Sequence, residues 1–375
     1  MKNENKMKII IVGISLAIFT ILLMLAHRGE NITLQGDMPR SIHFVSGRVV
    51  GYDPIEPTDH TPFDGQLLHV EILSGELEGI VAGIEHFFLN QRFPNYEIGD
   101  PVVVTLNEMT DSILIYNPNR SHILIGFAAL FLVLLCAIGG KRGILSVFGL
   151  IFSLASIVWI LIPLTLQGYS SILIAFIVAI LIILVSITLL AGVNPKSLTA
   201  MAGCVFGVTS AAILAFLVGN LAFITGYHTS QAGYLMPLEN IGLSGIFVSG
   251  VIISALGAIM DTSMTIASSM EEVKRANPTI SSKALFKAGF NVGRDVMGTM
   301  SNTLILAFVG SSLSLILLIF ASEVQFLHFI NDNEIGIEII QGIAGSTGIV
   351  LTVPFTTFIA AKLFSLKKFI RFDKT

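Results

Sequence analysis

Long apolar runs, separated by short polar segments, fill the chain from about residue 122 onward and occur once more near its N-terminus. A run of about 18 or more apolar residues is long enough to cross the hydrocarbon core of a bilayer as a helix. The pattern predicts an all-α polytopic membrane bundle. Its eight expected transmembrane helices are Ile9–Ala26, His122–Gly139, Ile144–Leu166, Ser171–Val193, Leu198–Thr225, Leu243–Ser268, Val296–Ala321 and Ile337–Phe364.

The region between the first two predicted spans, residues 28–121, has a different pattern. Apolar and polar residues alternate over short runs there, which is typical of β-strands with one buried face. Five such runs predict a small extracytoplasmic β-rich domain, a barrel or OB-like fold. They are His43–Val50, Gln66–Leu73, Gly79–Glu85, Pro101–Leu106 and Ser112–Tyr116.

The predicted organisation therefore has three parts. Residues 1–27 form an N-terminal segment and the first transmembrane helix, residues 28–121 the β-rich domain, and residues 122–375 a seven-helix transmembrane domain. The first helix is either a signal anchor or a cleaved signal peptide. Its length and the lack of a clear cleavage site favour the anchor.

Composition and charge agree with a membrane protein and add an orientation. The chain is 53% hydrophobic and only 12% charged, with a mean hydropathy of +0.83. All lysines and arginines outside residues 28–121 fall on one side of the predicted topology. Because basic residues collect on the cytoplasmic side, we expect both termini in the cytoplasm.

The segment after the sixth span predicts a cytoplasmic elbow, at about residues 271–295. Glu271–Arg275 continue the sixth helix, and Asn277-Pro278 ends it, since a residue before proline disfavours the helical conformation. A short amphipathic helix follows, with Ser282 as its expected cap and apolar Leu285 on one face. Its lysines suit a position on the anionic inner leaflet.

Asp261 is the one carboxylate deep inside the sixth predicted span. A charge at the bilayer centre costs about 2.5–3.5 kcal/mol on insertion scales, so such residues are rare and usually functional. Asp261 also lies on one helical face of small and polar residues, which suits a neighbouring helix or a watery cavity rather than lipid. That face consists of Gly250, Ser254, Gly257, Asp261, Thr265 and Ser268.

The seventh span brings four further polar residues to the same half of the membrane: Arg294, Asp295, Thr299 and Asn302. Helix rise places Asn302 and Asp261 at comparable depth, within about a turn. Two interpretations stay open. Asp261 either handles a proton or a cation, with Arg294 tuning it and Thr299 and Asn302 as ligands, or it accepts hydrogen bonds or an ion pair from Arg294 that lock two helices together.

The sequence gives little support for catalysis, metal binding or nucleic-acid binding. The sequence has no phosphate-binding P-loop, no nucleophile elbow and no H-E-x-x-H motif, so no enzyme is expected. Asp59, His60, Asp64 and His69 are the best local group of potential metal ligands, but their spacing fits no compact zinc site, and we predict no metal and no cofactor. No basic, aromatic-interleaved patch suits nucleic acid.

Two segments resemble the YibE/F family of bacterial multi-pass membrane proteins: Gly257–Met270 (GAIMDTSMTIASSM) and Gly293–Gly310 (GRDVMGTMSNTLILAFVG). The resemblance runs through nearly the whole chain, which looks like a fused form of two polypeptides. It implies a bacterial plasma membrane and supports the architecture. It points at Asp261, Arg294, Asp295 and Asn302 but names no chemistry for them, because the activity of the family is not established.

Two functions follow as hypotheses. The first is a transporter or channel-like permease that moves an unknown small solute or ion and uses the intramembrane carboxylate. The second is a non-transporting scaffold or signalling protein whose outer domain binds a protein or an envelope polymer. In both, the lipid bilayer is a partner of the chain.

Overall fold

The computed structural model describes residues 2–27, 42–55, 65–87, 95–107, 112–224, 242–322 and 325–365. The chain divides into two compact units, and each is described by itself. One is a helical unit of residues 1–33 and 138–375, and the other is a unit of residues 34–137 that contains a β-sheet.

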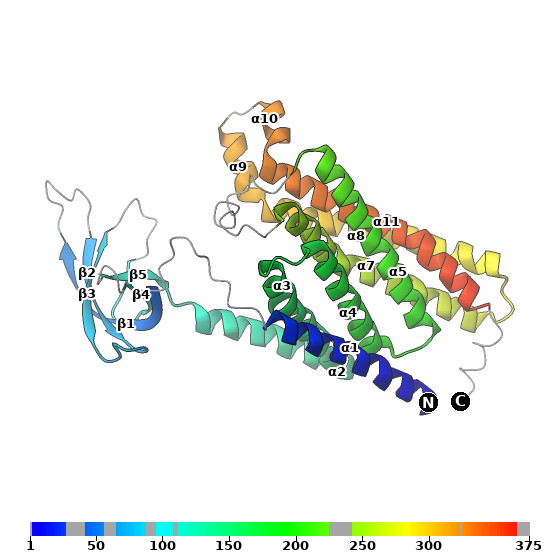
Figure 1. The fold of residues 1–375 in the computed structure, drawn as a ribbon, viewed down its shortest axis with the longest axis horizontal. Helices are drawn as coiled ribbons and strands as arrows, with labels where there is room; N and C mark the ends of the chain where they lie inside the picture. Colours follow the sequence, from blue (N-terminus) through cyan, green and yellow to red (C-terminus); the bar gives the residue numbers. More distant parts are fainter. Residues whose placement is uncertain are drawn as a thin grey trace. The chain divides into compact units, whose positions relative to one another are not determined.

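Five antiparallel strands form the sheet of the second unit, and all five predicted runs are confirmed (Figure 1). The strand order is β3-β2-β1-β4-β5, so the long β1 pairs with β2 along one edge and with β4 along the other. The strands are β1 Ile42–Ile55, β2 Gly65–Ile72, β3 Val81–Phe87, β4 Pro101–Asn107 and β5 Ser112–Pro118.

The sheet curls around an apolar core that includes Val49, Leu68 and Val104, all nearly inaccessible to solvent. The edge strands β3 and β5 contact each other, but the ladders between described strands do not include one that joins them. A small curled sheet is therefore present, whereas a closed barrel stays a prediction. The chain enters β4 through a turn in which Gly99 has a φ of +102°, a conformation that favours glycine.

Ten helical segments are described in addition to α1 (Lys2–Ala26). They are α2 Ser121–Ser156, the π-helical η1 Ile157–Leu161, α3 Ile162–Leu166, α4 Ser171–Ala191, α5 Pro195–Leu221, α7 Leu243–Ala276, α8 Ser282–Ser311, α9 Leu313–Ala321, α10 Phe326–Asn331 and α11 Asn333–Leu363. Within the described residues, six helical stretches are long and apolar enough to cross a membrane. A seventh is possible if α8 and α9, bent by 59°, act as one span.

The expected break between the second and third spans appears as a kink inside α2. Gly140 has φ +53° and ψ −132°, values outside the helical region, directly before the Lys141-Arg142 pair. The kink separates helical residues 121–139 from 141–156, close to the predicted boundaries. The count of eight spans itself stays a prediction.

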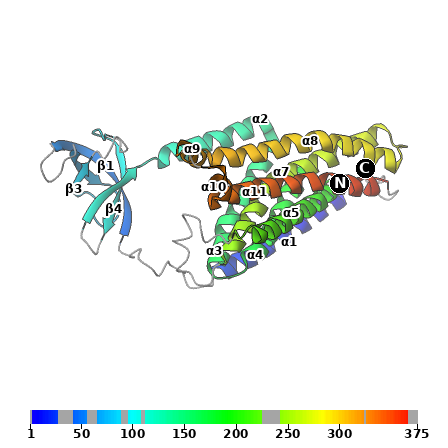
Figure 2. The ribbon, with the colours of Figure 1, turned by 90° about the horizontal axis from the view of Figure 1, so that it is seen from above.

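Helices α5, α7, α8 and α11 form the centre of the helical unit, where glycines allow close approach (Figures 1 and 2). A Cβ added at Gly207 would collide with Thr352 of α11 and would lie 2.9 Å from Ile259 of α7. One added at Gly348 would lie 2.8 Å from the carbonyl oxygen of Gly207. Glycine at these positions lets three backbones pack closely, as small residues do between membrane helices.

α7 ends at Ala276, before Asn277-Pro278 as predicted, but the helix that follows is longer than the short amphipathic helix expected there. Residues 282–295 are the first half of α8, which continues without a break to Ser311. The cap is Ser281 rather than Ser282, since the Ser281 hydroxyl accepts from the Ala284 N–H at 3.3 Å. Ser282 instead donates to the carbonyl of Ala361 in α11 at 2.8 Å. The early turns of α8 are thus packed against the bundle through Leu285, which is fully buried.

Candidate functional site

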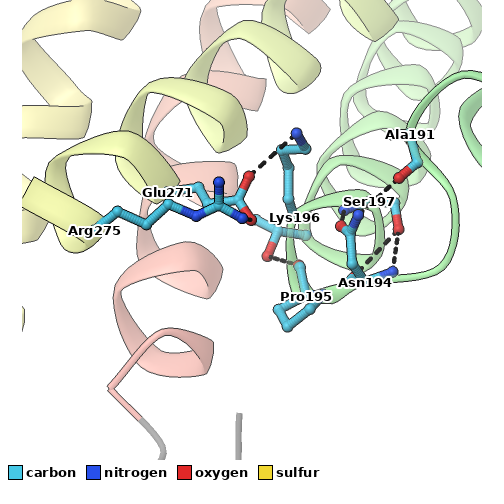
Figure 3. A network of polar contacts seen from close by, with 8 residues as sticks. Ala191, Asn194, Pro195, Lys196, Ser197, Glu271 and Arg275 are labelled. Atoms are coloured by element: carbon cyan, nitrogen blue, oxygen red, sulfur yellow. Dashed lines mark hydrogen bonds and ion pairs between the residues drawn. The ribbon is translucent and has the colours of Figure 1, made fainter. Parts of the chain in front are cut away.

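Most of the lysines and arginines of the helical unit lie at one of its ends, and an ion pair at this end fixes the position of α7. We call the end with Lys196, Lys274, Arg275 and Lys283 the basic end. α1 begins and α11 ends at the same end of the unit (Figure 1). Glu271 of α7 lies between Lys196 and Arg275, with N–O distances of 3.1 and 3.4 Å (Figure 3).

The turn before α5 is held in place by a reciprocal cap. The Asn194 side chain accepts from the Ser197 N–H at 2.8 Å, and the Ser197 hydroxyl lies 2.9 Å from the Asn194 N–H (Figure 3). This capping arrangement satisfies backbone groups that the first turn of a helix leaves unpaired. It presents Lys196 to Glu271, so the basic end of α7 is tied to α5 by an ion pair.

Asp261 lies ten residues before Glu271 in α7, about 15 Å from it along the helix axis. The flanking Thr262 and Ser263 are fully buried in the bundle. The Asp261 side chain is exposed, as are Gly257 and Thr265, one turn before and after it. The other described helices of the helical unit do not cover this face, so the neighbouring helix or cavity expected around Asp261 is not supplied by them.

The four candidate residues of α8 are also on its surface. Arg294, Asp295, Thr299 and Asn302 are all exposed. The Thr299 hydroxyl donates to the carbonyl of Val296 at 2.9 Å within the same helix. Among the described residues, no hydrogen bond or ion pair joins Asp261 to Arg294. The interpretation of Asp261 as a lock between α7 and α8 therefore has no supporting hydrogen bond or ion pair to Arg294 among the described residues.

The depth of these residues follows from how α8 packs on α7. A Cβ at Gly289 would collide with Met270, and one at Gly293 would lie 3.2 Å from Ile266. The two helices are antiparallel, so each step of four residues along α8 matches four residues back along α7. Continuing this register places Asp261 level with Gly298, and Asn302 one turn beyond it. The predicted agreement in depth holds to about one turn.

A cavity of about 370 Å³ lies near the opposite end of α7, within the helical unit. Its walls are almost entirely apolar and come from η1, α3, the start of α4 and α7. Gly250 lines the cavity and also belongs to the face that carries Asp261. Sequence reasoning missed this cavity, because the π-helical turn that shapes its wall has no distinctive sequence pattern.

A second carboxylate, Glu338 near the start of α11, was also missed. Its Oε2 atom is buried and has no hydrogen-bond partner among the residues that the structure describes. The sequence signal that could have identified Glu338 is its position in the first turns of a predicted span. In the other unit, His69 Nε2 lies 3.0 Å from Asp53 Oδ2, whereas Asp59, His60 and Asp64 lie outside the described residues.

Comparison with known proteins gives a single result. A family model described as YibE/F-like protein matches residues 127–366. No curated protein and no solved structure matches the chain. The matched region begins inside α2 and contains every candidate residue of α7 and α8.

Proposed function

The chain belongs to the YibE/F-like family, and from this premise we propose that it is a transporter or channel-like permease in which Asp261 binds and releases a proton or a cation. The observation that carries the proposal is the exposed Asp261 carboxylate in the middle of a long apolar helix. A charge in that position is costly in a bilayer. Such residues commonly mark ion and proton pathways.

The other candidate residues have supporting roles in this proposal. Arg294 stabilises the ionised carboxylate and so favours release of a bound proton or cation. Asn302 and Thr299 supply oxygen ligands close to the same depth. Asp295, beside Arg294 in sequence, balances its charge at the mouth of the pathway.

The face that carries Asp261 also suits a pathway along α7. Gly250 of this face lines the apolar cavity, and Asp261 lies eleven residues, or about 16 Å, farther along the helix. Between Gly250 and Asp261 this face carries only the small residues Ser254 and Gly257, which leave room beside the helix. We propose that the solute passes along this face.

The proposed location is a bacterial plasma membrane with both termini in the cytoplasm. The support is the distribution of lysine and arginine, because basic residues collect on the cytoplasmic side of membrane proteins. The β-sheet unit then faces outward.

Flux through proteoliposomes tests the transport role. Asp261→Asn keeps the shape of the side chain but removes its charge, and it should abolish proton-coupled or cation flux while leaving a folded, inserted protein. Glu272→Gln is the matched control, because Glu272 is exposed on the same helix outside the apolar stretch. Persistent flux in Asp261→Asn, with the control also active, would show that the role assigned to Asp261 is wrong.

The second candidate is a scaffold or signalling protein. The supporting observation is that residues 34–137 form a separate unit whose sheet has its own apolar core, which suits a binding module. In that case deletion of residues 28–121 should abolish function in cells, and Asp261→Asn should leave that function intact. The two variants therefore separate the candidates.

A further inference from the structure

We propose that two copies of the chain complete the Asp261 site together. The exposed face of α8 in one copy covers the Asp261 face of α7 in the other, and brings Asn302 and Arg294 of the second copy to the carboxylate. The inference concerns the same residue as the proposed function and deepens it by naming a partner. It requires only that α7 crosses a bilayer, and it holds whether or not the protein transports a solute.

Two polar faces are left open by the described helices of the helical unit. We call Gly250, Ser254, Gly257, Asp261, Thr265 and Ser268 the α7 stripe, and Arg294, Gly298 and Asn302 the α8 face. From Gly257 to Thr265, and all along the α8 face, the residues follow each other at intervals of four and are exposed. Residues at this interval lie on one side of a helix. Acyl chains offer no hydrogen bonds, so an exposed carboxylate, guanidinium and amide at this depth call for a protein partner.

The two faces match in depth. The register between α7 and α8 places Asp261 level with Gly298, Gly257 level with Asn302, and Thr265 level with Arg294. Two copies related by an axis perpendicular to the bilayer keep the same depths. The match therefore also holds between α7 of one copy and α8 of the other.

The two faces also match in shape. A Cβ added at Gly257 or Gly298 meets no atom within 4 Å, so each glycine leaves an open notch on its helix. In the proposed pairing, Asp261 fits over the notch at Gly298, and Asn302 fits over the notch at Gly257. Large residues lie opposite small ones, which is the packing that brings membrane helices close together.

The chemistry of the pairing is complementary as well. The Asn302 amide and the positively charged Arg294 guanidinium both donate hydrogen bonds, and the Asp261 carboxylate accepts them. Pairing of the α7 stripe with the α7 stripe of a second copy would instead place two carboxylates at one depth, which disfavours their ionised forms.

The first half of α2 is a weaker candidate for covering the stripe. Residues 123–135 contain no polar side chain, so this segment has no side-chain donor to offer Asp261 at its depth. A second copy supplies donors and notches at the required levels. For this reason we assign the covering surface to α8 of a second copy.

Cross-linking between differently tagged copies tests the proposal without any measurement of flux. In a background with Cys136→Ser and Cys204→Ala, one tagged chain carries Gly257→Cys and a second carries Gly298→Cys. The two are co-expressed, and membranes are treated with a short bis-maleimide, which spans the offset of one turn, about 6 Å, between the two positions. We expect a cross-linked species that contains both tags.

The matched control replaces Gly298→Cys with Gly310→Cys. Gly310 is exposed and open in the same way, but it lies eight residues, about 12 Å, from the level of Gly257, whereas Gly298 lies four residues, about 6 Å, from that level. We expect no cross-link to Gly257→Cys from that position. Equal cross-linking from both positions, or cross-linking only between two Gly257→Cys chains, would overturn the proposed pairing.

Native mass spectrometry of the unmodified protein in lipid nanodiscs provides an independent measurement that needs no cysteine variant. A dimer or a higher oligomer is expected. A monomer alone would overturn the proposal, while loss of flux in Asp261→Asn would still support a transport role. The two proposals can therefore fail separately.

Discussion

The two sides of α7 contain similar small and polar residues but have opposite surroundings. On one side, Ser263 and Ile259 lie against the glycines of α5 and are fully buried. On the other side, a Cβ added at Gly257 would meet no atom within 4 Å, and Asp261 is exposed within the helical unit. Small residues at helical spacing thus indicate close packing, but they do not say whether the packing partner belongs to the same chain.

The largest contrast is expected from adding volume on each side. Gly207→Val places methyl groups against Thr352 and Ile259. Because overpacking of a tight core costs about 1–3 kcal/mol, occasionally more, we expect a clear fall in the thermal unfolding temperature. Gly257→Val adds the same volume to an open notch and should leave the unfolding of the detergent-solubilised monomer unchanged.

The same pair of variants separates folding from association. Gly257→Val should reduce the oligomer fraction in nanodiscs, since it fills the notch proposed for Asn302. Gly207→Val should not alter association of the molecules that still fold. An oligomer unaffected by Gly257→Val would show that the open side of α7 is not an interface.

A smaller contrast is expected from removing charge on each side. Glu271→Gln weakens the pairs with Lys196 and Arg275, which are partly exposed, so we expect a loss of stability of no more than about 1 kcal/mol. Asp261→Asn breaks no contact within the described chain and should not destabilise the monomer. Denaturant titration in detergent at moderate ionic strength measures both. A larger loss in Asp261→Asn would show that an intrachain partner holds this carboxylate.

The smallest effect is expected for single hydroxyl groups. Thr265→Val removes a hydroxyl next to the proposed position of Arg294 from the second copy, and it should weaken association by about 0.6 kcal/mol, the average for polar contacts between membrane helices. Thr262→Val removes a hydroxyl that donates to the Ala258 carbonyl of its own helix at 2.8 Å, and should not change association. The dimer fraction as a function of protein-to-lipid ratio distinguishes the two.

Much of the architecture could be predicted from the sequence because it rests on local patterns. Alternating residues placed all five strands, and the apolar runs placed the helices, with a kink at Gly140 where a turn between spans was expected. The end of α7 before Asn277-Pro278 was expected, whereas the helix after it is longer than the predicted short amphipathic helix. Leu285 and the glycines after it face α7 and α11 rather than lipid headgroups, and an amphipathic pattern does not show which apolar surface it meets.

The candidate site was predictable only in part. Helical spacing predicted which residues form the α7 stripe, and helix rise predicted the depth of Asn302 relative to Asp261. It could not give the direction in which the stripe points, because that depends on how α4, α5, α8 and α11 surround α7. The apolar cavity beside Gly250 likewise arises from the packing of α7 against the consecutive segments η1, α3 and α4, which are distant from it in the sequence.

A density map of the protein in lipid nanodiscs tests most directly whether protein covers the Asp261 face. The account predicts α8 of a second copy against the α7 stripe, with the Asn302 amide or the Arg294 guanidinium within about 3 Å of the Asp261 carboxylate. Acyl-chain density along Gly257–Thr265, with no second chain beside it, would contradict the account.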